Sequence, residues 1–407
     1  MSNSNYRGMK YLRRKLIGKE NRGKLRYRYY DMKQTAADLM ISTPTNLRWL
    51  VETLGWCTKS VDSMADRIVF REFRDDVYNM NDIFAKNNPD IFADSVILAA
   101  LISSCGFVYI SPDETGFPRL QAIDGVNATG EIDPITGLLT EGYAVLQRDS
   151  DTKTPIMEAY FIEDRTYYYE KGVLTHVEYH KAGYPLLVPV IYKPDATRPF
   201  GHSRISRACM SLQDVAVRTL KRSEITAEFY SFPQKYVTGL SPDAEAMEKW
   251  QATVSSMLTF EKDDEGDHPV VGQFAQQSVQ PHIDQLKMAA SAFCGETGLT
   301  LDDLGFPQSN PSSVEAIKAA HETLRLTGRK AQRTFGSGLL NAGYVAACLR
   351  DQHKYDRWTI AQTKPIFEPL FEPDVSALSG IGDAMLKLNQ AIPDYITAEK
   401  MRDITGI

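Results

Sequence analysis

Few side chains in this 407-residue sequence have the spacing that catalysis or metal binding requires. His321-Glu322 begins like the zinc-binding helix of metalloproteases, but position 325, where the second histidine would stand, is arginine. We therefore interpret His321 as a surface or interface residue. Asp302 and Asp303 could together hold a magnesium ion, although adjacent carboxylates near a helix end are usually solvated. Neither pair predicts a metal site.

Other signatures of chemistry are also missing from the sequence. There is no Gly-rich phosphate loop with a terminal Lys-Ser/Thr, and no G-x-G-x-x-G follows an expected strand. Ser203 lacks the G-x-S-x-G elbow of the hydrolases. The acidic run 262–267 lacks the spacing of a calcium-binding loop. We expect no enzyme activity, no cofactor and no metal. The alternative that stays open is a metal-dependent nucleic-acid-processing enzyme using Asp302 and Asp303.

The bulk composition describes an ordinary globular chain, with 43% hydrophobic and 24% charged residues. A net charge of −6 argues against tight DNA binding, which normally needs a basic surface. Five scattered cysteines without a C-x-x-C pair predict buried, reduced thiols. The most apolar run, residues 95–110, is too short to span a bilayer, and the basic N-terminus lacks the apolar stretch of a signal peptide. We expect no membrane contact.

The hydrophobic pattern predicts an α+β chain. Helical spacing begins near residue 45 and recurs over 81–104, 204–230, 283–295, 314–350 and 381–390. Between 105 and 195, short aromatic and β-branched runs separated by turn residues predict an antiparallel meander. Glycines within 314–350 predict kinks. Residues 1–30 carry ten basic side chains against one acidic one, and we interpret them as a solvated, partly disordered arm or as a contact for nucleic acid or an acidic partner.

A polar loop joins two of these helices and organises the chain. Pro307 and Pro311 bias the residues before them away from helix, and Gln308, Ser309 and Asn310 have no apolar side chain to bury. Residues 312–315 then read as a capping box that starts the next helix. The pattern alone is typical of a surface linker. The other interpretation is a loop presented to something outside the fold.

The order of these elements resembles the portal proteins of tailed bacteriophages over nearly the whole chain. Three segments carry the resemblance: a helix that runs into a Gly106-containing strand, an apolar strand followed by Gly201-His202-Ser203 opening a long helix, and residues 296–317 with their Gly-Leu and Glu-Ala-Ile patterns. Unrelated proteins have no reason to share the order and spacing of all three segments.

The resemblance implies a portal fold and a ring of usually twelve subunits at one capsid vertex. Its parts would be a basic N-terminal arm (1–30), a wing (31–202), two stem helices (203–231 and 279–297) and a clip inserted between them (232–278). A tunnel-loop region (298–313) would lead into a long kinked helix (314–364) and a small C-terminal crown (365–407). The chain departs from larger members of that family in having a short C-terminal region.

Candidate site residues follow from this assignment. The tunnel loop touching DNA would comprise Phe306, Pro307, Gln308, Ser309 and Asn310. The clip would dock the packaging motor and then the tail adaptor through its acidic residues, Glu261, Asp263, Asp264, Glu265 and Asp267. The stem would present charged residues, Arg218, Lys221, Arg222, Asp284 and Lys287.

The expected function is a DNA conduit for genome packaging and ejection, assembled in the host cytoplasm and retained in the virion. The expected partners are the large terminase subunit, a head-tail adaptor, the major capsid protein, a scaffold protein and the double-stranded DNA passing through. A ring with a net negative charge would mostly repel the phosphates of DNA. A DNA conduit needs this repulsion, because tight binding would stall translocation. Another head-tail adaptor ring remains an alternative, although that family is usually shorter and lacks a sheet-rich first half.

Overall fold

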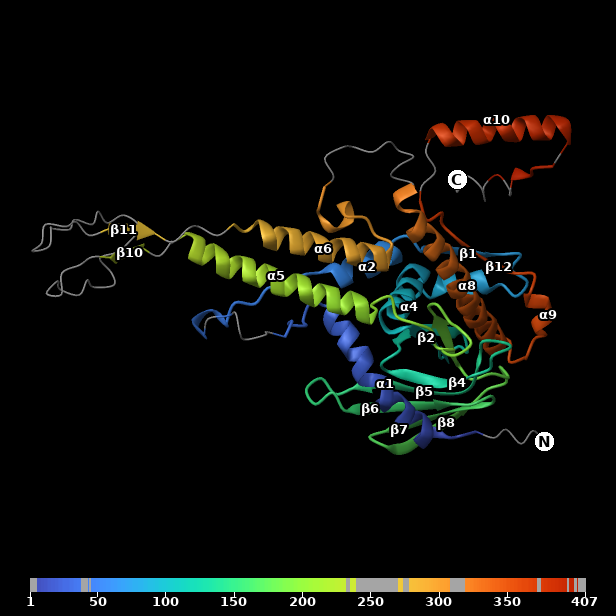
Figure 1. The fold of residues 1–407 in the computed structure, drawn as a ribbon. Coiled ribbons are helices and arrows are strands. Elements are labelled where there is room, and N and C mark those ends of the chain that lie inside the picture. Colours follow the sequence, from blue (N-terminus) through green and yellow to red (C-terminus); the bar gives the residue numbers. More distant parts are fainter. Residues whose placement is uncertain are drawn as a thin grey trace, which may run out of the picture. The chain divides into compact units, whose positions relative to one another are not determined.

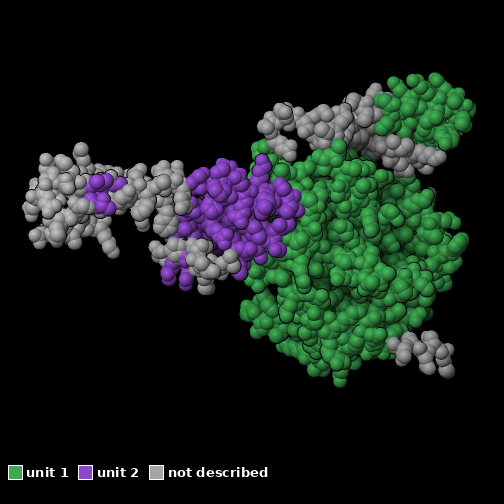
Figure 2. Space-filling model, viewed as in Figure 1, with its two compact units in different colours: residues 1–34, 55–210, 294–407 green, residues 35–54, 211–293 purple. Residues whose placement is uncertain are grey.

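The computed structural model describes residues 6–37, 43, 45–231, 235–238, 270–273, 278–307, 319–371, 375–393, 395–398 and 401 (Figure 1). The chain divides into two compact units (Figure 2). Unit 1 comprises residues 1–34, 55–210 and 294–407, and unit 2 comprises residues 35–54 and 211–293. The combination of helices with antiparallel sheets confirms the expected α+β class.

The antiparallel meander expected over residues 105–195 is smaller in the structure, because residues 105–124 and 187–191 contribute their strands to a second sheet. It consists of five consecutive strands of unit 1: β4 (Ala128–Ile132), β5 (Leu139–Arg148), β6 (Pro155–Phe161), β7 (Arg165–Glu170) and β8 (Val173–Tyr179). The first of them, β4, was not predicted. Lys171 and Gly172 connect β7 to β8 with φ values of 47° and 83°. A two-residue hairpin turn of this kind needs positive φ at both positions, so the Lys-Gly pair is a genuine turn signal.

A second sheet has the order β3 (Pro118–Asp124), β2 (Cys105–Pro112) and β9 (Leu187–Ile191). Helix α4 (Pro89–Ser103) packs along β2 and β3, and helix α8 (Glu322–Arg350) packs along β9. A Cβ atom on Gly106 would lie 2.5 Å from the carbonyl oxygen of Val96, so only glycine fits where α4 approaches β2. The glycine in the expected helix–Gly–strand segment is therefore required by the close packing of α4 against β2.

Two helical expectations in the first hundred residues need correction. The helix expected from residue 45 is instead a short 3-10 turn, η1 (Thr45–Leu47), followed by α2 (Trp56–Ala65). The helix expected over 81–104 is split into α3 (Met80–Lys86) and α4. The break lies at Asn88, which has a φ of 53° and precedes Pro89 at the start of α4. Proline disfavours helical backbone in the residue before it, which is why an apolar pattern that looks continuous is interrupted.

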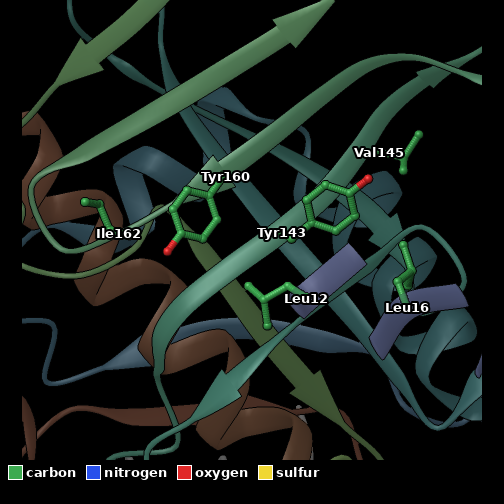
Figure 3. Close-up of a cluster of buried hydrophobic side chains, with 6 residues drawn as sticks. All are labelled: Leu12, Leu16, Tyr143, Val145, Tyr160 and Ile162. Atoms are coloured by element: carbon green, nitrogen blue, oxygen red, sulfur yellow. The ribbon is translucent and has the colours of Figure 1, made fainter. Parts of the chain in front are cut away.

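The expectation of a partly disordered N-terminal arm is wrong for helix α1 (Met9–Tyr30). Its residues Leu12 and Leu16 are one turn apart and are buried against four side chains of the meander, namely Tyr143, Val145, Tyr160 and Ile162 (Figure 3). Because basic residues dominate this segment of the sequence, the short apolar stripe was not recognised. The helix is consequently part of the core of unit 1, and its charged residues lie around that contact.

Helix α8 is continuous from Glu322 to Arg350, and its glycines lie at close contacts. A Cβ on Gly336 would lie 2.7 Å from Cγ of Pro365, and one on Gly343 would lie 2.9 Å from Sδ of Met80. The sequence led us to expect kinks at these glycines. Their role in the structure is to let neighbouring segments approach the helix closely.

The remaining elements of unit 1 are short. Strand β1 (Phe70–Arg74) pairs with β12 (Lys364–Phe367), and both were missed because four or five residues show little periodicity. Helix α9 (Arg357–Ile360) precedes β12, and α10 (Val375–Ala391) covers and extends the expected tail helix. All five cysteines are buried and none forms a disulfide, which confirms that expectation. No helix in the described ranges has the length and hydrophobicity to cross a bilayer.

Unit 2 is built mainly from two helices, α5 (Arg207–Ser231) and α6 (Gln280–Thr297), whose first and last turns respectively belong to unit 1. Between them lie two paired strands, β10 (Lys235–Thr238) and β11 (Val270–Gln273). The element order helix, strand, strand, helix is the one expected for an insert between two rods. Residues 239–269 lie outside the described residues.

Candidate functional site

The base of the polar loop is closed by a contact between its two ends. Nε2 of His321 lies 3.3 Å from a carboxylate oxygen of Asp303. The same carboxylate accepts hydrogen bonds from the backbone amide and hydroxyl of Thr300, at 2.8 and 2.9 Å. Gly298 lies beside the following helix, where an added Cβ would be 3.2 Å from Cγ2 of Thr323. The segment between residues 304 and 320 is therefore held together at its base.

The electrostatics of Asp303 fit a structural carboxylate. Burial acts to raise its pKa, but the hydrogen bonds from Thr300 and the nearby His321 prevail, and the pKa lies below the usual value. Within the part of the chain that the structure describes, no three acidic, histidine or cysteine side chains are grouped as a metal site would require. His321, which we expected at a surface or interface, lies partly buried at this loop base.

Only the first residues of the predicted tunnel loop can be placed. The 3-10 turn η2 (Asp302–Leu304) ends at Gly305, whose φ of 84° reverses the chain. The amide of Phe306 then donates to the carbonyl of Leu301 at 3.0 Å, and Pro307 is exposed. The polar tip (Gln308, Ser309 and Asn310) and the capping box at 312–315 lie outside the described residues.

Helices α5 and α6 lie side by side within unit 2 (Figure 1). The hydroxyl of Thr226 on α5 is 3.1 Å from Nε2 of His282 on α6. Apolar side chains of both helices are buried, including Ala216, Val217, Ile225, Ala289, Ala290 and Phe293. Yet Ile283 and Met288 of α6 remain 47% and 64% exposed. Trp49 and Val51 of the same unit are also exposed, at 74% and 60%.

The predicted stem residues divide into two groups. Arg218, Lys221 and Arg222 on α5 are half-buried, whereas Asp284 and Lys287 on α6 are exposed. The carboxylate of Asp284 accepts a hydrogen bond from the side chain of Gln280 at 2.9 Å. The five residues therefore lie at helix-surface positions of two different helices.

The predicted clip begins and ends at a two-stranded ladder. Lys235 pairs with Gln273 and Thr238 pairs with Val270, which brings the chain entering the insert next to the chain leaving it. The acidic residues proposed for docking, Glu261, Asp263, Asp264, Glu265 and Asp267, lie outside the described residues.

Sequence reasoning missed the role of Arg204, which the helical spacing places at the start of the long helix. Arg204 is only 7% exposed, and its guanidinium donates to the backbone carbonyls of Ser60 and Thr297, the latter at 2.9 Å. Its backbone amide donates to Leu101 at 2.8 Å. One buried side chain thus joins α2, α6 and the start of α5. The Gly-x-Ser segment immediately before Arg204 was the sequence feature that could have indicated this role.

The Gly-x-Ser segment itself has a local reason in the structure. Gly201 has a φ of 71°, and an added Cβ would lie 2.0 Å from the carbonyl oxygen of Tyr192. The Ser203 hydroxyl donates to the carbonyl of Ile102 at the end of α4, at 2.6 Å. Both residues therefore fix the path of the chain from the second sheet into α5, which is a positioning task and not a catalytic one.

The basic residues of α1 are partly neutralised by the meander. Lys15 lies 2.7 Å from a carboxylate oxygen of Glu131, and Arg13 lies 3.3 Å from Glu158. The exposed cations without a carboxylate partner among the described residues are Lys10, Arg14, Arg22 and Arg28. The remaining basic face is suited to an acidic partner, as one of the two interpretations of the arm proposed.

Comparison with known proteins identifies relatives of the chain. No family model matches it. It is 25% identical over 334 residues to the portal protein of Mycobacterium phage D29, covering 76% of this chain and 67% of that protein. It is also 25% identical over 345 residues to the portal protein of Mycobacterium phage L5, covering 78% and 69%.

Solved structures give weaker likenesses. The neck of an empty gene transfer agent particle computed with C6 symmetry matches with a TM-score of 0.49 at 14% identity, over 87% of this chain and 90% of that one. The neck of the native particle computed with C12 symmetry matches with a TM-score of 0.45 at 14% identity, over 86% and 89%. Scores below 0.5 carry no argument about function. The sequence comparison confirms the expected resemblance: the chain is similar to the portal proteins of two mycobacteriophages.

Proposed function

We propose that this chain assembles into the ring through which a phage genome enters and leaves its capsid. The observation that carries the proposal is its similarity to two mycobacteriophage portal proteins over three quarters of its length. The chain would act without catalysis of its own. Twelve copies follow from the family resemblance stated above, with unit 2 contributing the stem helices and the insert contributing the clip.

Exposed apolar side chains in unit 2 support self-assembly. Trp49, Val51, Ile283 and Met288 are all more than 45% exposed in the isolated chain. Large apolar side chains that are exposed in an isolated chain can belong to surfaces that another protein covers. In a ring every copy presents two different surfaces to its neighbours, so such side chains become buried without a separate partner protein.

The closed base of the polar loop supports its proposed role in the channel. The Asp303–His321 contact and the Thr300 hydrogen bonds fix where the loop leaves and re-enters the fold. A loop anchored in this way can carry its uncharged tip, Gln308 to Asn310, to a passing duplex without adding a cation that would bind phosphate strongly. Docking of the terminase and of the tail adaptor is assigned to the insert between β10 and β11.

Electron microscopy of the purified chain tests the central proposal. The expected result is a closed ring with an axial hole, and a stable monomer at micromolar concentration would contradict it. Deletion of residues 308–310 should leave the ring intact and reduce packaged DNA in a complementation assay. Charge reversal at Asp263 and Asp264 should weaken capture of the terminase and the adaptor, whereas the same change at half-buried Asp149 and exposed Asp151, in the β5–β6 turn, should not.

A further inference from the structure

A groove in unit 1 combines an apolar floor with a cationic wall. It has a volume of about 810 Å³ and lies between the exposed face of α8, strand β9, the segment 194–199 and the β4–β5 turn. Pro189, Ile191 and Pro199 line the floor, and three cations of α8 line the wall: Arg329, Lys330 and Arg333.

The three cations of the wall are exposed, and none has a hydrogen-bonding or ion-pairing carboxylate among the described residues. Two carboxylates also line the groove, but each is held by its own loop. Asp133 accepts from the amide of Ile135 and from the hydroxyl of Thr136, at 3.1 and 2.6 Å. Asp195 accepts from His202 and from the residues that follow it. The cations of α8 are thus the groups left to meet a ligand.

Exposed apolar side chains border the same groove. Leu326, one turn before the cations on α8, is 54% exposed. Ile135, at the tip of the β4–β5 turn, is 93% exposed, and Trp358 is 80% exposed. Arg357, adjacent to Trp358, lies 3.4 Å from the carbonyl of Thr136, so α9 and this turn are neighbours. Cations bordered by large exposed apolar groups are typical of protein-binding surfaces, where arginine and tryptophan contribute most of the binding energy.

A complementary surface exists elsewhere on unit 1, at the ends of α2 and α4. Asp66, Asp90 and Asp94 are exposed there, beside Ile91, which is 64% exposed. Partial burial, and then the charges of Asp90 and Asp66, raise the pKa of Asp94. No cation in the described residues offsets this repulsion. We call this set of four residues the acidic patch.

The groove and the acidic patch lie on different sides of α8. At about 100° per residue, Leu326, Arg329, Lys330 and Arg333 share one face of the helix. Gly328 belongs to the opposite face, where an added Cβ would be 3.4 Å from Sδ of Met64 in α2. Asp66 directly follows the last residue of α2, and α2 contacts the buried face of α8. The acidic patch therefore lies on the side of α8 that is opposite the groove. One copy therefore cannot close its groove with its own patch.

We propose that the groove binds the acidic patch of the next copy of this chain around the ring. The contact pairs two different surfaces, which is the head-to-tail geometry that a closed ring requires. The three cations of α8 meet Asp66, Asp90 and Asp94, and Ile91 enters the apolar floor. This inference rests on the proposed ring and names the surfaces that join its subunits.

Charge reversal with mixing tests this contact. One variant reverses the groove (Arg329→Glu, Lys330→Glu, Arg333→Glu), and the other reverses the patch (Asp90→Lys, Asp94→Lys). Each variant alone places like charges at every contact, and the subunit concentration for half-assembly should rise at least tenfold. An equimolar mixture can alternate around the ring with opposite charges at every contact, and assembly should return to within threefold of the unmodified chain. Mass photometry measures both quantities.

A general effect of net charge would weaken each variant without recovery in the mixture, and that result would overturn the proposal. Cross-linking provides a second readout, because the five native cysteines are buried. Arg333→Cys and Ile91→Cys chains, mixed and treated with a short bis-maleimide, should give covalent dimers that neither variant gives alone. Absence of these dimers from intact rings would overturn the proposed contact but leave the ring itself. If the unmodified chain forms no ring, the proposed function fails and this contact fails with it.

Discussion

The carboxylate of Glu141 accepts a hydrogen bond from the backbone amide of Gly8 at 3.0 Å, which places a buried acid of β5 at the start of α1. The amide of Arg7 and the hydroxyl of Tyr160 donate to the same carboxylate, at 2.9 and 2.8 Å. The first amides of a helix have no partner within the helix, and its dipole favours an anion there. Glu141 therefore attaches the N-terminal helix to the meander.

Glu141→Gln should loosen this attachment. The amide side chain removes the charge and places a donor against amides that are themselves donors, which should cost about 1–3 kcal/mol of unfolding free energy. Limited proteolysis should then cleave within residues 9–30 faster than in the unmodified chain. Glu131→Gln is the matched control, because its partner Lys15 is half-exposed and the pair should contribute less than about 1 kcal/mol. Equal cleavage of both variants would show that Glu141 does not hold α1.

Arg204→Met should destabilise unit 1 strongly. The methionine fills much of the space but leaves the carbonyls of Ser60 and Thr297 without their donor, at a cost of about 2–4 kcal/mol. Urea unfolding measures the change. Arg207→Met, three residues later at an exposed position, should change stability by less than about 0.5 kcal/mol. A small effect at Arg204 would show that water readily replaces the guanidinium.

His180→Phe should remove part of the acid sensitivity of the fold. His180 is 6% exposed, and neither ring nitrogen has a hydrogen-bond partner among the residues that the structure describes. Burial lowers its pKa from 6.5 to about 4, while nearby Asp164 acts in the opposite direction. Between these values the unfolded chain binds a proton that the folded chain does not. The free energy of unfolding is therefore unaffected by His180 above pH 6.5, and it decreases as the pH falls toward 4.

The pH dependence of urea unfolding checks this sign. The histidine should account for about 3 kcal/mol at most between pH 6.5 and pH 4. The phenylalanine variant should show a correspondingly flatter profile over the same range. His353→Phe is the control, because His353 is exposed. Identical profiles for the unmodified chain and His180→Phe would contradict the assignment.

Gly336→Ala tests whether the glycines of α8 are contact sites. Alanine normally favours a helix, but here its Cβ would lie 2.7 Å from Cγ of Pro365 and 3.2 Å from the ring of Phe367. We expect a loss of about 1–3 kcal/mol, measured by urea unfolding. The added Cβ of Gly295→Ala in α6 meets no described residue within 4 Å, and this change should instead be neutral or stabilising by up to about 1 kcal/mol.

Patterns within single elements predicted much of this fold. The alternation of the meander, the long helix α5 and the turn at Lys171-Gly172 could all be read from neighbouring residues. Contacts between distant segments could not. Nothing near Glu141 in sequence indicates that it binds amides more than 130 positions away, and the burial of Arg204 depends on carbonyls from two other helices.

The glycines of α8 show the same limit. In sequence, glycine inside a helical pattern predicts weakness or a kink. Its actual use here depends on Pro365, Met80 and Leu370, which approach the helix from elsewhere in the chain. The candidate loop was found from its prolines and polar residues, whereas the Asp303–His321 contact at its base required the structure. The tip residues of the loop and the acidic residues of the clip stay predictions.

The pairing of Lys235 with Gln273 has a consequence for how such proteins diversify. Because the chain departs from and rejoins the helical pair at neighbouring points, the stretch between β10 and β11 can be exchanged for a longer or shorter one without displacing either helix. The entropy of closing a loop grows only slowly with its length. An engineered epitope or an affinity handle placed between the two paired strands should therefore leave both helices in position.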